Sequence, residues 1–287
     1  MPTKSKQNLN TQSIRIGGIG ALISHRFRGF APRENTLPGL RAALDFGVQN
    51  LEFDVRMAKC GTPMIYHDEF ALDGDGNKQY LCDYKASEYA RLGGTFAHMP
   101  TLDALFSTVK VHRNKTAKLL IDIKDLGFEV EINALVMYYH LQHRTIYVSW
   151  LPEVLYRICA LAPDVPLCLS HWCGDVSKEV AANHDMHLSE DGTIPRLDAP
   201  YMTGVRYGWV LKQALSGEML RILRASGGGI CVPQSMLTRT LSDFYHDQDL
   251  FVSTFSYTDW PSINAHKTAL NVDMYFIDDR QVFDELP

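Results

Sequence analysis

The sequence lacks long apolar runs, an apolar leader and an excess of positive charge. No run of about 18 uninterrupted apolar residues occurs, which argues against an integral membrane segment. Residues 1–18 are polar and contain no apolar core of a signal peptide, so no secretory signal is expected there. The net charge is −5 at pH 7, so the chain lacks the excess of positive charge that is typical of nucleic-acid-binding proteins.

Paired cysteines are also missing. None of the six cysteines forms a Cys-x-x-Cys pair, and several lie in apolar runs, as is typical of buried reduced thiols. Cys168 and Cys173 flank His171, but a closed zinc site needs a fourth ligand and a recognisable second half. This pattern favours a cytoplasmic protein with reduced thiols over a zinc protein.

Length and apolar patterning favour one large domain. The chain has 287 residues, of which 46% are hydrophobic, and a closed barrel of strands and helices occupies about 250 residues as one unit. We expect residues 1–18 to form a flexible N-terminal segment and residues 19–287 to form a single domain.

Strand-like apolar runs alternate with helix-like stretches along the chain. The predicted strands are Leu22–His25, Leu51–Val55, Leu119–Lys124, Ile146–Trp150, Pro166–Ser170, Gly229–Pro233, Leu250–Phe255 and Met274–Asp278. The predicted helices are Leu37–Phe46, Leu102–Val111, Phe128–Gln142, Pro152–Leu161, Glu218–Ala225 and Thr238–His246. Repeated strand-helix units indicate a parallel sheet, and eight strands can close it. The predicted fold class is α/β, a TIM-type (β/α)8 barrel.

Two segments exceed a minimal strand-helix repeat. Residues 69–99 form a short insertion after the second strand, and residues 171–216 form a longer one after the fifth. The second segment is rich in Trp, Tyr and His, and long loops in compact domains tend to be functional or interfacial. We interpret residues 171–216 as a subunit contact of a homo-oligomer or as a lid that shapes the substrate site.

Glu52 and Asp54 interrupt an otherwise apolar strand. Side chains at positions i and i+2 of a strand point the same way, so both carboxylates face one space. A hard divalent cation prefers oxygen ligands grouped in this way. An isolated Glu-x-Asp pair is more often solvated and structural, so the neighbouring motifs decide between the two interpretations.

Those neighbouring motifs carry a family resemblance. His25-Arg26, Glu34-Asn35-Thr36, Glu52-Phe53-Asp54-Val55 and His67-Asp68 resemble the His-Arg-Gly, Glu-Asn-Thr, Glu-x-Asp-Val and His-Asp motifs of the glycerophosphodiester phosphodiesterase family, within the phosphatidylinositol phospholipase C-like phosphodiesterase superfamily. The run Leu120–Lys124 resembles the family's Glu-Ile-Lys strand, and Val272–Asp279 resembles its closing strand.

The resemblance implies metal-dependent hydrolysis of glycerophosphodiesters to sn-glycerol 3-phosphate and an alcohol. It implies one divalent cation, Mg or Ca, held by Glu52, Asp54 and Asp122. His25 and His67 are expected to act as an acid and base pair. The expected substrate-binding residues are Arg26, Lys124 and Glu34, and Asn35 and Thr36 are expected to organise the backbone at the start of a helix.

Departures from the family pattern raise two questions. Phe27 stands where the family usually has Gly, and Gly29 follows two residues on, so the backbone after His25 must turn differently or a local glycine must substitute. Asp122 stands where the family has Glu, and its side chain is one methylene shorter. Two alternative functions remain open: a lysophospholipase D or sphingomyelinase D-like phosphodiesterase acting on lipids, and a barrel that binds phosphodiesters without turnover.

Overall fold

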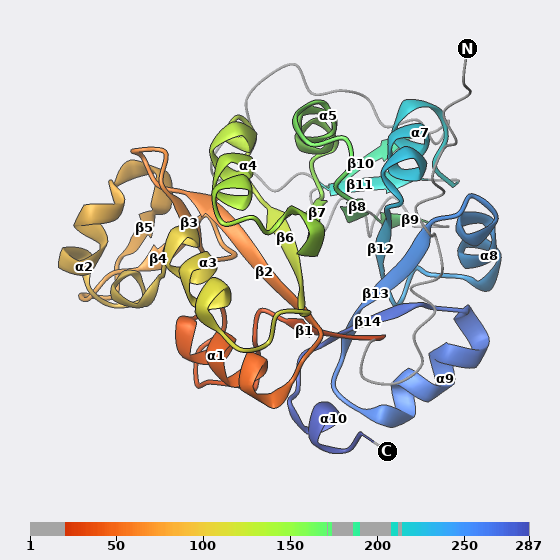
Figure 1. Ribbon diagram of the computed structural model, residues 1–287, viewed down its shortest axis with the longest axis horizontal. Coiled ribbons are helices and arrows are strands. Elements are labelled where there is room, and N and C mark those ends of the chain that lie inside the picture. Colours follow the sequence, from red (N-terminus) through yellow and green to blue (C-terminus); the bar gives the residue numbers. More distant parts are fainter. Residues whose placement is uncertain (1–20, 171, 174–185, 190–207, 212–213, 287) are drawn as a thin grey trace, which may run out of the picture.

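The computed structural model describes residues 21–170, 172–173, 186–189, 208–211 and 214–286, shown in colour in Figure 1. The predicted flexible segment 1–18 lies outside the described residues, as does most of residues 171–216.

Eight parallel strands close into a barrel (Figure 1). In order around the barrel they are β1 (Leu22–His25), β2 (Asn50–Met57), β6 (Lys118–Ile123), β7 (Thr145–Ser149), β8 (Leu167–Ser170), β12 (Gly229–Pro233), β13 (Phe251–Tyr257) and β14 (Met274–Ile277). Pairing of Leu22 with Tyr275 joins the first strand to the last. The predicted (β/α)8 barrel is confirmed, and each of the eight predicted strands overlaps one strand of the barrel.

Helices cover the outside of this barrel (Figure 1). They are α1 (Leu37–Phe46), α3 (Leu102–Val111), α4 (Glu129–Tyr138), α5 (Pro152–Leu161), α7 (Gly217–Ser226), α8 (Arg239–Asp247), α9 (Trp260–Leu270) and the short α10 (Gln281–Asp284). Helix α4 is shorter than the predicted Phe128–Gln142, because His140 takes a left-handed φ of 55° that ends the helix, and a 3₁₀ turn follows at Gln142–Arg144.

The strands present two different faces. On β2, Leu51, Phe53 and Val55 belong to the large core between barrel and helices. Residues of the opposite face at the start of other strands, such as Ile23 and Leu120, pack in a second apolar cluster inside the barrel. Because side chains alternate along a strand, residues two positions further along continue the inward face toward the carboxyl ends of the strands. This geometry directs polar residues near the strand ends into the mouth of the barrel, where sites of such barrels lie.

The insertion after the second strand has its own small core. The antiparallel strand β3 (Pro63–Ile65) pairs with β2, and a hairpin of β4 (Phe70–Leu72) and β5 (Lys78–Tyr80) follows. Helix α2 (Tyr89–Leu92) and 3₁₀ turns at Leu81–Asp83, Ala86–Glu88 and Phe96–His98 complete it. Its buried residues are Ala58, Met64, Ala71, Leu81, Tyr89 and Phe96. The segment is thus a packed unit against the barrel (Figure 1).

Within the second insertion, three short strands form a parallel sheet in the order β10 (Met186–Ser189), β11 (Gly208–Leu211), β9 (Trp172–Cys173). The residues on which a lid or subunit contact would depend lie outside the described residues. In the described part of the chain, the helices are too short or too polar to cross a membrane.

Candidate active site

Three buried carboxylates meet at the mouth of the barrel. Glu52 and Asp54 lie on β2, and Asp122 lies on β6 directly opposite Asp54 in the strand register. One oxygen from each lies within 4.8 Å of the others, and the residues are 1%, 0% and 8% exposed. The shorter Asp122 side chain therefore reaches the other two carboxylates, because strand pairing rather than side-chain length brings it there.

Two buried cations accompany these carboxylates. Arg26 Nε lies 3.0 Å from Asp54 Oδ2, and Lys124 Nζ lies 3.0 Å from Asp54 Oδ1 and donates a hydrogen bond to Asp122. Burial acts to raise the pKa of Asp54, but Lys124 and Arg26 hold it well below its usual range. Burial, together with repulsion from Asp54 and Asp122, raises the pKa of Glu52 well above its usual range. The cluster thus places three carboxylates beside two cations, and the raised pKa of Glu52 reflects this imbalance.

This donor set fits a divalent cation. The three side chains offer only oxygen, the ligand type preferred by Mg and Ca. Among the described residues, buried Asp122 Oδ1 has no hydrogen-bond partner. Since buried polar atoms are nearly always paired, an unpartnered oxygen within a carboxylate cluster indicates a position for a cation.

His25 is oriented by a carboxylate from the far end of the chain. Its Nδ1 lies 2.6 Å from Asp278 Oδ1, just beyond β14, and its Nε2 lies 3.8 Å from Glu52 Oε2. Burial lowers the pKa of His25, and its hydrogen bond to the Asp278 carboxylate opposes that shift. When Nδ1 donates to Asp278, Nε2 is the basic nitrogen and faces the carboxylate cluster.

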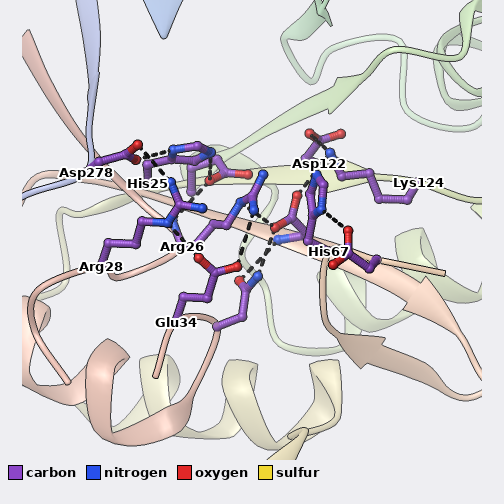
Figure 2. Close-up of polar contacts among 12 residues, drawn as sticks. His25, Arg26, Arg28, Glu34, His67, Asp122, Lys124 and Asp278 are labelled. Atoms are coloured by element: carbon purple, nitrogen blue, oxygen red, sulfur yellow. Dashed lines mark hydrogen bonds and ion pairs between the residues drawn. The ribbon is translucent and has the colours of Figure 1, made fainter. Parts of the chain in front are cut away.

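His67 has a similar arrangement from a different element. It follows β3, and its Nδ1 lies 2.8 Å from Oδ1 of the adjacent Asp68. Burial lowers the pKa of His67, while the nearby charge of Asp54 opposes the shift. In Figure 2 Arg26 lies between the two histidines, with Asp278 beside His25 on one side and Asp122 near His67 on the other. Each predicted acid/base histidine therefore has a carboxylate at Nδ1.

A chain of ion pairs borders the site (Figure 2). Glu34 accepts from Arg26 Nη1 at 3.2 Å and from Arg28 Nε at 2.6 Å. Arg28 Nη1 in turn lies 2.8 Å from Asp278 Oδ2. Glu34 and Arg26, both predicted to bind substrate, thus contact each other, and Arg28 links them to the carboxylate that holds His25.

The backbone after His25 turns without the glycine of the family motif. Arg26 and Phe27 take left-handed φ values of 56° and 59°, and the Phe27 ring is fully buried against Phe53. A non-glycine residue in this region costs about 1–2 kcal/mol, which burial of an aromatic ring can offset. Phe27 therefore takes the left-handed conformation itself, and Gly29, two residues further on, also has a positive φ of 75°.

Asn35 contributes to the site more directly than expected. Thr36 caps α1 by accepting from Gly39 N at 3.3 Å, as predicted. Asn35 instead donates its amide to Asp54 Oδ2 at 2.8 Å from a buried position. Asn35 thus does more than organise the backbone near the helix start, since its side chain also orients one carboxylate of the cluster.

The sequence predicts eight catalytic, metal-binding or substrate-binding residues. The structure places all of them in one region: His25, Arg26, Glu34, Glu52, Asp54, His67, Asp122 and Lys124. The sequence analysis did not identify Arg28 as a partner of Glu34, Asp68 as a partner of His67 or Asp278 as a partner of His25. Asp68 and Asp278 had a readable signal, because each is an acidic residue at the end of a motif or closing strand. Arg28 had none.

Comparison with known proteins agrees with this geometry. The model of the glycerophosphoryl diester phosphodiesterase family matches residues 21–188. A glycerophosphodiester phosphodiesterase of Caldanaerobacter subterraneus subsp. tengcongensis is 25% identical over 228 residues, covering 73% of this chain and 92% of that protein. Human glycerophosphodiester phosphodiesterase 1 is 27% identical over 162 residues, and the match covers 52% of this chain but only 48% of the human protein.

Solved structures share the fold. A putative glycerophosphoryl diester phosphodiesterase of Silicibacter pomeroyi superposes with a TM-score of 0.67 at 20% identity, covering 91% of each chain. A phosphodiesterase of Oleispira antarctica, solved in complex with the product sn-glycerol-3-phosphate, gives a TM-score of 0.62 at 19% identity, covering 92% of this chain and 94% of that one. With the family model matching more than half of the chain, across the strands that carry the carboxylates and both histidines, this protein belongs to the glycerophosphoryl diester phosphodiesterase family.

Proposed function

We propose that this protein hydrolyses glycerophosphodiesters to sn-glycerol 3-phosphate and an alcohol, with a divalent cation and a pair of histidines. Membership of the family supports the enzyme class. The observation that carries the proposal is the buried cluster of Glu52, Asp54 and Asp122 with a carboxylate-bound histidine on either side.

The three carboxylates would hold one Mg or Ca ion, which when bound would stabilise negative charge on the phosphate. Arg26 and Lys124 already lie beside the cluster, so an anionic phosphate arriving there would meet two buried cations. Arg26 has the planar fork that suits phosphate oxygens, whereas Lys124 supplies a point charge.

His25 and His67 would share the proton transfers. One histidine removes a proton from the attacking water or from a neighbouring glycerol hydroxyl, and the other protonates the leaving alcohol as its bond to phosphorus breaks. If the glycerol hydroxyl attacks, the product is a cyclic phosphate, which water then opens to sn-glycerol 3-phosphate with the proton transfers reversed. The Nδ1 contacts with Asp278 and Asp68 orient each ring, so that Nε2 is the nitrogen that would carry this transfer.

The test is turnover of defined substrates. Purified protein is incubated with glycerophosphocholine, glycerophosphoethanolamine and a lysophospholipid, and release of the alcohol is followed with Mg, with Ca and with chelator. We expect metal-dependent release from the water-soluble diesters. Turnover of the lysophospholipid alone would replace the proposal with a lipid phosphodiesterase, and no turnover of any substrate would favour a binding function.

A further inference from the structure

His67 lies outside the barrel wall. It follows β3, a strand of three residues at the edge of the sheet, and the last backbone contact before it joins Tyr66 N to Asp54 O at 3.1 Å. His25, in contrast, ends a barrel strand that is paired on both sides. The position of the His67 ring relative to the carboxylates therefore depends on contacts made after the strand ends.

Arg56 provides such a contact from inside the mouth of the barrel. It follows Glu52 and Asp54 at the same i+2 spacing on β2, and its side chain is only 4% exposed. Its Nε donates to the backbone oxygen of His67 at 2.9 Å. The guanidinium thus links the strand that carries two carboxylates to the residue that carries the second histidine.

Asp125 fixes the orientation of this guanidinium. Its Oδ1 accepts from Arg56 Nη1 at 2.6 Å, and its Oδ2 accepts from the backbone N–H of Met57 at 2.8 Å. Asp125 directly follows Lys124, whose backbone N–H donates to Val55 O. An ion pair between buried Arg56 and half-buried Asp125 therefore connects the ends of β2 and β6 with the loop of His67.

We propose that Arg56, held by Asp125, is a positioning residue that sets the place of His67 relative to the carboxylate cluster. This inference rests on the proposed function, in which His67 is one of the two proton-transfer groups. The rigid fork of arginine suits the task, because it can hold one donor on a backbone oxygen and another on a carboxylate.

A purely structural ion pair would behave differently on replacement. Buried ion pairs contribute little net stability, so replacing both partners with apolar residues of similar size commonly leaves the fold intact. The double variant Arg56→Met/Asp125→Leu therefore removes the tie to His67 without leaving an unpaired buried charge. Arg144→Met is the matched control, because Arg144 is also a buried arginine that donates to a backbone oxygen, that of Ala117, at the opposite end of the barrel.

The kinetic experiment compares these variants with the wild type and with His67→Ala. We expect the double variant to lower kcat by about 10- to 100-fold with a smaller change in KM, since misplacement of a catalytic group by about 1 Å costs rate on this scale. In the His67→Ala background the same double substitution should cost less than about 3-fold, because residues that act through one group are not additive. Full additivity, or an unchanged kcat, would overturn the proposal.

A second readout does not depend on turnover. NMR of histidine-labelled protein, with the His67 signals assigned from a His67→Asn variant, should show a shift of those signals in the double variant and no shift in Arg144→Met. Unchanged His67 signals would overturn the proposal whatever the kinetics. An inactive wild type would refute the proposed function, while the NMR comparison would still decide whether Arg56 positions the ring.

Discussion

Replacing Asp122 with asparagine is expected to abolish binding of the divalent cation without unfolding the barrel. Two carboxylates whose oxygens lie within 4.8 Å of each other repel by at least about 3.5 kcal/mol at an effective dielectric constant of about 20, so the cluster of Glu52, Asp54 and Asp122 is costly without a cation. Asp122→Asn removes repulsion from the other two carboxylates and also loses attraction to Lys124. These changes oppose each other, and we expect the metal-free stability to change by no more than about 2 kcal/mol.

The divalent cation should stabilise the wild type against thermal unfolding but should not stabilise the Asp122→Asn variant. A cation present at about 100 times its dissociation constant adds about 2.7 kcal/mol to the stability of the protein that binds it. For a chain of 287 residues, with an unfolding entropy of about 2.1 cal/mol/K per residue, that corresponds to a rise in Tm of about 4–5 °C. The wild type should show this rise with Mg or Ca and lose it with chelator, and Asp122→Asn should show little or none.

The assay is thermal unfolding followed by circular dichroism, with calorimetric titration of each metal. Asp164→Asn serves as the control, because Asp164 is an exposed aspartate in the turn before β8, at the other end of the barrel. A full metal-dependent rise in Asp122→Asn would refute the assignment of this residue as a ligand. Absence of any rise in the wild type would refute the metal site as a whole.

Three further predictions concern the histidine and the turn beside it. His25→Ala should lower turnover by about 10²- to 10⁴-fold, as expected for loss of a proton-transfer group, while circular dichroism stays that of a folded barrel; an unchanged rate would contradict its role. Asp278→Asn should lower kcat by up to about 10⁴-fold with little change in KM, because His25 loses the carboxylate at Nδ1. Kinetics equal to the wild type would show that this contact is dispensable. Phe27→Gly and Phe27→Ala should each cost about 3–5 kcal/mol from loss of the buried ring, but the glycine variant should be about 1 kcal/mol more stable in urea unfolding, since its φ is 59°. The opposite order would show that the left-handed turn carries no strain.

The barrel was readable from the sequence because its strands are short, apolar and separated by helices. Parallel strands covered on both faces need continuous apolar residues, as in Leu119–Ile121. Helix α9 was missed for the opposite reason, since Ile263 is its one buried residue in the described structure and its apolar pattern is weak. The predicted range of helix α4 was too long, because the residue type of His140 does not predict its left-handed φ.

The candidate site divides in the same way. Glu52 and Asp54 share a face by strand alternation, which local spacing alone predicts. The place of Asp122 beside Asp54 depends on the register of β2 against β6, and the contact between His25 and Asp278 spans 253 positions of the chain. The local spacing of residues in the sequence predicts neither of these two contacts.

The sequence by itself determined the fold class and the residue types available for phosphodiester chemistry, because apolar periodicity and short motifs are local properties. Only the tertiary structure decided that Phe27 takes the left-handed conformation, that Asn35 holds Asp54, and that Arg56 contacts the backbone of His67. These features depend on closure of the barrel, which brings the ends of separate strands to one mouth. Buried charged and polar groups from different strands can therefore pair with one another there.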